Sequence, residues 1–502
     1  MFLDRIVAQT RLDLEQRKLD VPLAEIQLQA ASQPPARDVL AALRPVPADR
    51  QVRLIAEVKR ASPSKGLLAP HLDPVELACT YEAHGAAMIS VLTEPHFFLG
   101  SPAYLTAIKQ AVHTPVLRKD FIIDEYQVYE ARAWGADAIL LICAILDDSQ
   151  LRRLLHVAHH QDMHCLVEVH NAVEAQRAVA AGATIIGVNS RDLKTFALNP
   201  YLLRELRPLI PADRIVIAES GIHTSTDARR LSRYDVQAML IGEALVKSDN
   251  VPAQIHSLLE GANASTQIKI CGLRVPAHID AAIEAGADLL GLIFYEPSHR
   301  YIAPQQVQQV LAQTRYATSP KDGQSVPNLP DLVGIFVNKD ANFINEVIEQ
   351  ADLHFVQLHG NEAPEFSQQI HRPVLKALQL RSAEDSALVD AHRATSWRIL
   401  LDTPTNAWGG TGETHDWELA RSIAQATPII LAGGLTPDNV QSAITHVQPW
   451  GVDVSGGIET NKQKDITKIQ AFIQNVRNIP PRAYPSRTDE PYQNALDFAR
   501  GS

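Results

Sequence analysis

The chain has 502 residues, of which 46% are apolar and 21% are charged, and its 46 Lys and Arg against 57 Asp and Glu give a formal net charge of −11. At about 150 residues per domain this length predicts two to four domains, and the composition excludes a wholly disordered, collagen-like or disulfide-dense chain. The acidic balance argues against a nucleic-acid-binding protein, and it requires that an anionic substrate be held by local donors.

The cysteines and the N-terminal sequence favour a cytoplasmic protein that does not enter a membrane. The four cysteines are too few for a disulfide framework and include no CxxC pair: Cys79, Cys143, Cys165 and Cys271. The longest apolar run, Ala138–Leu146, is too short to span a bilayer. Asp4 and Arg5 place charges where a signal peptide needs an apolar stretch.

In chain order, residues 1–50 are expected to form an extension that is helical around residues 3–19 and 38–43. A pattern of a helix, a Gly-Ala pair and a short apolar run then recurs, with its glycines at Gly85, Gly135, Gly182 and Gly286. A glycine after a helix is typical of a left-handed C-cap, and an all-apolar run predicts a strand buried on both faces. The alternation therefore predicts a parallel sheet covered by helices.

Two sets of eight strand-like runs follow one another along the chain. The first set is 53–58, 87–92, 115–119, 137–142, 164–169, 184–188, 214–218 and 238–241. The second set is 267–271, 288–294, 332–337, 353–357, 373–377, 397–402, 428–432 and 451–454. Eight strands close a (β/α)8 barrel, so we expect an α/β protein with two tandem TIM barrels. A doubly wound open sheet is the alternative, but no Gly-x-Gly-x-x-Gly follows the first strand of either set.

These sets define the predicted domain organisation. It comprises a first barrel domain at 1–260, which includes the helical extension 1–50, a polar linker at 261–266, a second barrel domain at 267–479 and a tail at 480–502. The tail is expected to be disordered because it has no sustained apolar period. Residues 319–330 are rich in Pro, Gly and polar residues and are expected to be an inserted loop.

Ionisable and polar side chains lie at the ends of five predicted strands in the first barrel. They are Glu57, Lys59, Lys119, Glu168, Asn189, Arg191 and Glu219. In a barrel, chemistry belongs at the carboxyl ends of the strands, and converging acids and bases suit general acid–base catalysis. Solvated ion pairs at the rim are the alternative for each residue alone, but five strands with the same feature favour a site.

Each barrel also has glycine-rich turns after its seventh and eighth strands, where a barrel commonly holds a phosphate on backbone N–H groups. In the first barrel these turns contain Ser220, Gly221, Gly242 and Glu243. In the second they contain Gly433, Gly434, Ser455, Gly456 and Gly457. A single Gly-Gly pair usually marks only a tight turn, but the same placement in both barrels indicates two phosphate sites.

The second barrel ends its first strand with Cys271 and its sixth with Asp402, a possible base and acid at one mouth. An inert core thiol is the usual state of a lone cysteine, but the following glycine favours a reactive thiolate here. A helix cap is the alternative for Asp402. Arg300 offers a fork for a carboxylate, and Gln357, His359 and Gly409–Gly412 are further strand ends, although His359 could simply pack. No spacing suits a metal or a dinucleotide.

These residues together resemble two enzyme families of tryptophan biosynthesis. The first half resembles indole-3-glycerol phosphate synthase through Ile55–Gly66, Leu117–Phe121, Leu166–His170, Gly187–Leu193 and Ala218–Gly221. The second half resembles phosphoribosylanthranilate isomerase through Lys269–Gly272, Pro297–Arg300, Gln357–Gly360, Leu401–Asp402, Gly409–Gly412 and Ala432–Gly434. The order matches the fused bifunctional bacterial enzyme, and the resemblance covers about nine-tenths of the chain.

For the second barrel, the resemblance implies an Amadori rearrangement with Cys271 as general base and Asp402 as general acid. Arg300 would hold the anthranilate carboxylate, and Gln357 and His359 would contact the substrate. The turns at 433–434 and 455–457 would hold the phosphate. Gly456 stands where the family leads us to expect a serine, so backbone donors must supply that contact.

For the first barrel, the resemblance implies ring closure followed by loss of carbon dioxide and water. Lys119 would be the general acid and Glu168 would assist dehydration, with Lys59 as the competing proton donor. The remaining implied substrate contacts are Glu57, Asn189, Ser62, Phe121, Arg191 and Glu219. The implied phosphate contacts are Ser220, Gly221, Gly242 and Glu243, the last through its backbone N–H only.

The resemblance implies no cofactor, small phosphorylated anthranilate-derived substrates and no nucleic-acid or membrane partner, and we expect a monomer. One rival is that one barrel is an inactive scaffold, which the intact acid, base and glycine residues of both mouths oppose. Another is the related aminoimidazole carboxamide ribotide isomerase of histidine biosynthesis. That family has an Asp on its first strand, where this chain has Cys271.

Overall fold

The computed structural model describes residues 2–44, 51–263, 266–315, 329–380, 382–403 and 417–480. The chain divides into two compact units between residues 264 and 265. Three predicted features fall wholly or mostly outside the described residues: the 409–412 loop, the 319–330 insertion except for its last two residues, and the tail beyond residue 480. Among the described residues, no helix has both the length and the apolar character needed to cross a membrane.

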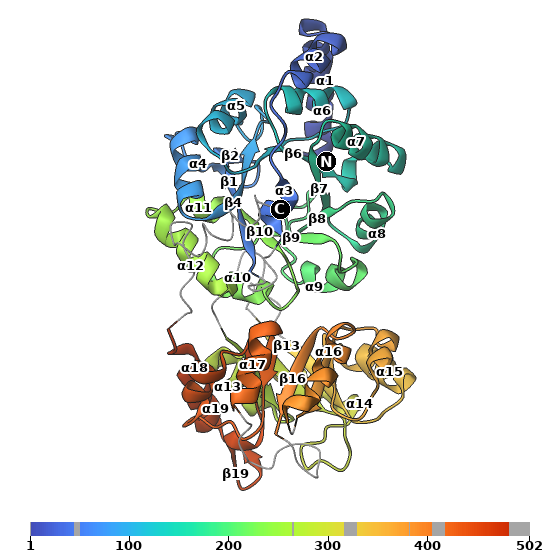
Figure 1. Ribbon diagram of the computed structural model, residues 1–502, viewed down its shortest axis with the longest axis vertical. Helices are drawn as coiled ribbons and strands as arrows, with labels where there is room; N and C mark the ends of the chain where they lie inside the picture. Colours follow the sequence, from blue (N-terminus) through green and yellow to red (C-terminus); the bar gives the residue numbers. More distant parts are fainter. Residues whose placement is uncertain are drawn as a thin grey trace. The chain divides into compact units, whose positions relative to one another are not determined.

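The first unit is a closed barrel of parallel strands, as the sequence predicts, surrounded by helices (Figure 1). Its strands are β1 (Arg53–Val58), β4 (Ala86–Leu92), β5 (Val116–Lys119), β6 (Ala138–Ile142), β7 (His164–Val169), β8 (Ile185–Asn189), β9 (Ile215–Glu219) and β10 (Ala238–Ile241). Because β1 pairs with both β4 and β10, the sheet closes on itself. The doubly wound open sheet is therefore excluded for this unit.

Helices follow the strands of the first unit in sequence. They are α4 (Pro74–Ala83), α5 (Pro102–Ala111), α6 (Glu125–Ala133), α7 (Asp148–His160), α8 (Ala172–Ala180), α9 (Leu202–Leu206), α10 (Ser225–Leu231), α11 (Glu243–Val246) and α12 (Val251–Asn263). A short hairpin of β2 (Ala61–Ser62) and β3 (Gly66–Leu67) follows β1. Short 3-10 turns lie at η1 (Cys143–Ile145) and η2 (Arg207–Leu209).

The second unit is also a closed parallel barrel with its strands in sequence order. They are β11 (Gln267–Cys271), β12 (Leu289–Ile293), β13 (Asp331–Phe336), β14 (Phe355–Leu358), β15 (Val374–Gln379), β16 (Arg398–Asp402), β17 (Ile429–Leu431) and β18 (Gly451–Val454). The helices are α13 (Pro276–Ala285), α14 (Pro304–Leu311), α15 (Ala341–Ala351), α16 (Ser386–Arg393), α17 (Trp417–Ala426), α18 (Val440–Val447) and α19 (Ile466–Arg477). The two-tandem-barrel prediction is thus confirmed.

Three short 3-10 segments and a hairpin complete the second unit. The segments are η4 (Pro364–Gln369), η5 (Ala383–Asp385) and η6 (Gly456–Ile458). The hairpin of β19 (Glu459–Thr460) and β20 (Gln463–Lys464) follows η6 directly, on the side of the barrel where β18 ends. Its position places it beside the turn that the sequence predicts for phosphate binding.

The apolar runs form buried strands for the expected reason. All residues of β1, β4 and β6 are buried, because helices cover the outside of the barrel and side chains fill its inside. The helix-ending glycines behave as predicted: Gly135 has φ +94° and Gly286 has φ +93°. A left-handed residue at these positions turns the chain from helix to strand at little cost for glycine.

The N-terminal extension contains one helix that the sequence analysis missed. The predicted helices are present as α1 (Phe2–Asp20) and α3 (Val39–Leu43), but α2 (Leu23–Ala31) lies between them. The extension packs on α6, where the Tyr126 hydroxyl donates to the carbonyl oxygens of Arg17 and Val21 at 3.0 and 2.8 Å. Arg17 Nε also lies 2.8 Å from Glu130 Oε1.

The linker predicted at 261–266 begins inside a helix, which is a correction to the sequence analysis. Helix α12 continues to Asn263, whose side-chain amide accepts from Val52 N at 2.7 Å and donates to Val52 O at 3.0 Å. Gly261 lies where α12 meets the start of α10, and a Cβ there would collide with the carbonyl oxygen of Ser225. The glycine that suggested a linker therefore serves close helix packing.

Candidate active sites

Each barrel has a cavity at the carboxyl ends of its strands that gathers the described residues singled out in the sequence. The first is lined by Glu57, Lys59, Ser62, Lys119, Phe121, Glu168, Asn189, Arg191, Glu219, Ser220, Gly221, Gly242 and Glu243, among others. The second is lined by Cys271, Arg300, Gln357, His359, Asp402, Gly433, Gly434, Ser455, Gly456 and Gly457, among others. Every site residue predicted from the sequence thus lines the cavity of its own barrel.

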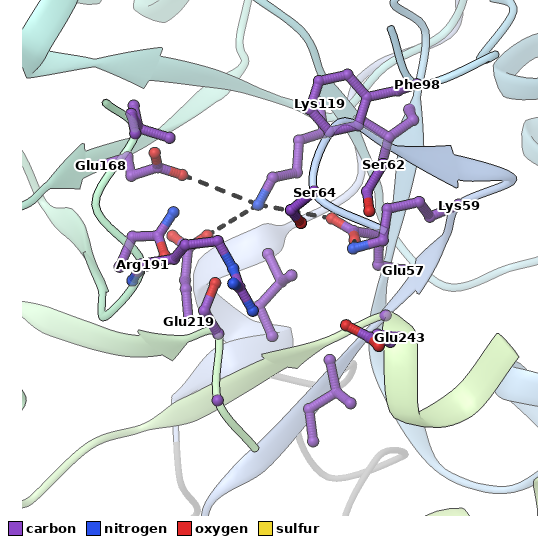
Figure 2. A pocket seen from close by; sticks show the side chains of 18 of the residues that line it. Glu57, Lys59, Ser62, Ser64, Phe98, Lys119, Glu168, Arg191, Glu219 and Glu243 are labelled. Carbon is purple, nitrogen blue, oxygen red and sulfur yellow. Dashed lines mark hydrogen bonds and ion pairs between the residues drawn. The ribbon is translucent and has the colours of Figure 1, made fainter. Parts of the chain in front are cut away.

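The ammonium group of Lys119 lies at the centre of the first cavity, among three carboxylates (Figure 2). Its Nζ is 2.8 Å from Glu219 Oε2, 3.6 Å from Glu57 Oε2 and 3.9 Å from Glu168 Oε2. The three carboxylate side chains are 3% exposed or less, so these are not the solvated rim pairs that the sequence left as an alternative.

This arrangement sets the protonation states of the cluster. Burial by itself lowers the pKa of Lys119, but the three carboxylates outweigh it and raise the pKa well above its usual value. Burial raises the pKa of Glu219, and the charge of Lys119 offsets that only in part. Burial also acts against the charge of Glu57, but Lys59 and Lys119 lower its pKa overall. The cavity therefore favours the charged form of the lysine and sets it beside carboxyl groups of different acidity.

His170, which the sequence analysis quoted in a motif without a role, contacts the cavity residue Glu168. Its Nε2 lies 3.2 Å from Glu168 Oε1, and its Nδ1 lies 3.2 Å from Glu174 Oε2. Burial alone would lower the pKa of His170, but the hydrogen bonds with both carboxylates raise it to about 10. The charged imidazole and Lys119 in turn lower the pKa of Glu168 against the effect of burial.

The rest of the first cavity combines an aromatic wall with polar groups. Phe98 and Phe121 lie 6.1 Å apart between ring centroids and line one side. Arg191 donates from Nη1 to the carbonyl oxygen of Phe196 at 3.2 Å, which holds the loop after β8 in place. An aromatic wall beside a guanidinium suits a substrate with an aryl ring and an anionic group.

The glycine turns of the first cavity have the backbone geometry that close approach of a ligand requires. Ser220 and Gly221 both have positive φ, +65° and +73°. A Cβ on Gly242 would collide with Glu57 Oε1, so this glycine also makes room for the carboxylate cluster. The Glu243 side chain pairs with Lys247 at 2.8 Å, which leaves its backbone as the part expected to contribute to a phosphate site.

In the second cavity, Cys271 lies beside a buried ion pair that the sequence analysis did not identify. Lys269 Nζ is 2.9 Å from Asp453 Oδ1, and both Lys269 and Asp453 act electrostatically on the thiol. The spacing alone could have pointed to Lys269, because residues two apart on a strand share a face. Burial raises the pKa of Cys271, and Lys269, Lys464 and Arg300 offset this only in part. Burial thus opposes the thiolate that the sequence analysis favours, and the three cations favour it.

Asp402 ends β16 and lies in a chain of polar side chains. His359 Nε2 lies 3.3 Å from Asp402 Oδ2, and Gln357 Nε2 lies 2.8 Å from His359 Nδ1. The other oxygen, Asp402 Oδ1, accepts from the backbone N–H of Thr403 at 2.9 Å. His359 thus faces the cavity beside Asp402 and is not a packing residue, and Asp402 caps no helix among the described residues.

Arg300 does not stand free, as its predicted role would suggest. Its Nε and Nη2 lie 2.6 and 2.9 Å from the two carboxylate oxygens of Glu459. Lys464 Nζ lies 2.9 Å from the same carboxylate, at Oε1. The sequence analysis missed Glu459 and Lys464, because the hairpin that brings them to the cavity is too short to leave a periodic signal.

The second cavity also has the expected glycine turns. Gly433 and Gly434 have φ +80° and +63°, and a Cβ on Gly457 would collide with the carbonyl oxygen of Leu435. The Lys464 ammonium donates to the carbonyl oxygen of Ser455 at 2.8 Å. In the described part of the chain, no group of three or more His, Cys, Asp or Glu side chains is placed to hold a metal ion.

Comparison with known proteins gives one family match for each barrel. The family model described as indole-3-glycerol phosphate synthase matches residues 3–258. The model described as N-(5'phosphoribosyl)anthranilate (PRA) isomerase matches residues 268–475.

Several curated proteins are similar over nearly the whole chain. A multifunctional tryptophan biosynthesis protein of Phycomyces blakesleeanus is 36% identical, over 95% of this chain and 69% of that protein. One of Schizosaccharomyces pombe is 37% identical, over 95% of this chain and 66% of that protein. The tryptophan biosynthesis protein TrpCF of Yersinia pestis is 35% identical, over 95% of this chain and 94% of that protein. The chain thus spans about two thirds of the two fungal relatives.

Proposed function

Since the chain belongs to the indole-3-glycerol phosphate synthase and phosphoribosylanthranilate isomerase families, fused in that order, we propose that each cavity carries the reaction of its own family. The chain is a bifunctional enzyme of tryptophan biosynthesis, with the isomerase in the C-terminal barrel and the synthase in the N-terminal barrel. What remains to be assigned is the role of each side chain. The observation that carries the assignment is that both cavities unite acid, base and glycine-turn residues.

In the second barrel, we assign Asp402 as the general acid and Cys271 as the general base of the Amadori rearrangement. Asp402 protonates the furanose ring oxygen of N-(5-phosphoribosyl)anthranilate, and the ring opens to an iminium ion. Cys271 then removes the proton from C2, and the resulting enolamine becomes the ketone 1-(2-carboxyphenylamino)-1-deoxyribulose 5-phosphate. Because burial raises the pKa of the Cys271 thiol, the cations Lys269 and Lys464 have the task of stabilising its thiolate.

In the first barrel, we assign Lys119 as the general acid. An aryl carbon of the isomerised substrate attacks the ketone, and the oxygen takes a proton from Lys119, which its neighbours keep charged. Loss of carbon dioxide restores the aromatic ring, and loss of water, assisted by Glu168, gives indole-3-glycerol phosphate. Lys59, paired with Glu57, remains the competing donor.

The substrate-binding roles follow the same division. In the first barrel, Ser220, Gly221, Gly242 and the Glu243 N–H hold the phosphate, and Phe121 and Arg191 contact the aryl carboxylate portion. In the second, Gly433, Gly434 and the 455–457 turn hold the phosphate. Neither reaction as assigned requires a cofactor. We propose a monomer because each cavity draws its lining from one barrel of one chain, and a cytoplasmic protein because its four cysteines are free thiols.

The test is to assay both reactions in Cys271→Ala and in Lys119→Ala. We expect Cys271→Ala to lower isomerase kcat by at least about 1000-fold with synthase activity unchanged, and Lys119→Ala to do the reverse, because each residue supplies a proton transfer in one cavity only. Loss of both activities in either variant would contradict separate sites. Full activity in either variant would refute that residue's role.

A further inference from the structure

The contact between Arg300 and Glu459 fixes which edge of the guanidinium can receive a ligand. Arg300 donates hydrogen bonds from Nε and Nη2 to the two carboxylate oxygens of Glu459, at 2.6 and 2.9 Å. In the described part of the chain Nη1 has no hydrogen-bond partner, so the Nη1–Nη2 edge remains for a carboxylate. A guanidinium held in one plane loses less entropy on binding a carboxylate than a free arginine does.

The hairpin that follows η6 is built to present Glu459 and Lys464 together. The two residues are directly opposite in the register of β19 and β20. The turn residues Asn461 and Lys462 both have positive φ, +52° and +61°, as a two-residue hairpin turn requires. Lys464 Nζ lies 2.9 Å from Glu459 Oε1, and Lys468 Nζ donates to the Glu459 carbonyl oxygen at 2.9 Å.

Lys464 also contacts Ser455, which lines the cavity. Its Nζ donates to the Ser455 carbonyl oxygen at 2.8 Å and lies 3.3 Å from Ser455 Oγ, within the turn proposed to hold phosphate. Ser455 Oγ in turn donates to the carbonyl oxygen of Cys271 at 3.3 Å. A continuous set of contacts therefore runs from Arg300 through Glu459 and Lys464 to Ser455.

The opposite charges of Glu459 and Lys464 favour one fixed position for the two side chains. The side chains of Glu459 and Lys464 are only 9% and 4% exposed, so each would be costly to leave without the other. Burial acts against the charge of Glu459, but hydrogen bonds from Arg300 and Lys464 lower its pKa to about 2. The ionised form of Glu459 is therefore favoured at neutral pH.

We propose that Glu459 and Lys464 are positioning residues of the isomerase site, and that they hold its carboxylate-binding Arg300 and its phosphate-binding Ser455 turn as one rigid unit. This inference rests on the proposed roles of the second cavity. It assigns the hairpin a purpose that neither the strand ends nor the glycine turns supply. Both ends of the substrate then meet donors that are already in place, which lowers the entropy lost on binding.

The experiment compares Glu459→Gln, Glu459→Asp and Lys464→Met in the full chain, with isomerase kcat and KM as the main readout. Inorganic phosphate and anthranilate serve as inhibitors that probe the two ends separately. We expect Glu459→Gln to raise KM and the anthranilate inhibition constant about tenfold with kcat within about threefold, and the phosphate constant to stay near wild type. Lys464→Met should weaken both inhibitors, and Glu459→Asp should restore part of the anthranilate affinity.

Two controls separate positioning from a folding defect. Glu349→Gln removes a carboxylate that is 69% exposed on α15, and it should leave every constant unchanged. The synthase activity of the same chain reports that the variant protein is intact. An unchanged KM in Glu459→Gln, or an equal fall in kcat with a lowered melting temperature, would overturn the inference. A wild-type chain without isomerase activity would instead overturn the proposed function and this inference with it.

Discussion

Among single residues, His170 is expected to make the free energy of unfolding of the first barrel depend on pH. Its pKa of about 10 in the folded chain lies above its ordinary value of 6.5. A group whose pKa is raised on folding stabilises the protein fully below the unfolded pKa, and loses that effect as pH rises through the folded pKa. The contribution of His170 should therefore be complete below about pH 6.5 and decline toward pH 10.

We expect His170→Gln to lower the free energy of unfolding of the first barrel by about 1–3 kcal/mol at pH 6.5, because it removes the ion pair with Glu168 and the charge-assisted hydrogen bond with Glu174. The difference from wild type should shrink as pH approaches 10. Urea unfolding at both pH values measures it. His71→Gln, at an exposed position, is the control and should show neither effect. A difference that grows with pH would contradict the assignment of charge to His170.

At the scale of elements, the contact of the N-terminal extension with α6 depends on the Tyr126 hydroxyl. It donates to two carbonyl oxygens where α1 ends and α2 follows. Tyr126→Phe keeps the buried ring and removes only these bonds, so we expect a loss of about 1 kcal/mol in local stability. Faster hydrogen exchange across α1 and α2 would report it, with Tyr104→Phe as the control. Unchanged exchange would show that packing alone holds the extension.

The strands were the part of the fold most accessible from sequence. The predicted runs lie within two residues of the observed strand ends, because a strand buried on both faces is mostly apolar, as β6 is along its whole length. Helix α2 was missed although most of its residues are apolar, because Leu23 and Leu28 are exposed and only Ile26 and Ala30 are buried, so no regular buried face marks the helix. Gly261 was misread because the sequence cannot show the neighbouring helix that forbids a side chain there.

Some residues of the two sites could also be predicted from the sequence, and others could not. Residues at strand ends, such as Lys119 and Asp402, could be found because barrel topology sends every strand end to one mouth. Glu459 and Lys464 could not, because their place depends on a hairpin register rather than on a strand end. The protonation state of Cys271 was also beyond the sequence, since it reflects burial and three neighbouring cations.

At the scale of the whole molecule, the two barrels share no strand pairing in the described parts of the chain. Each sheet is complete within its own unit. We therefore expect separate chains of residues 1–263 and 266–480 to fold and to keep the synthase and isomerase activities, respectively, within about threefold of the intact enzyme. Steady-state assays of the two halves check this. An inactive, unfolded second half would show that it needs the first barrel for stability.

The closure of both large sheets affects when this chain can aggregate by strand addition. Apolar strands such as β6 would template intermolecular strand addition if they bordered an open sheet. In the folded barrels every such strand pairs with a neighbour on both sides, so neither large sheet has an open edge to which a second molecule could add a strand. Strand addition at the two large sheets is thus expected only during synthesis and refolding, before the last strand of each barrel pairs with the first.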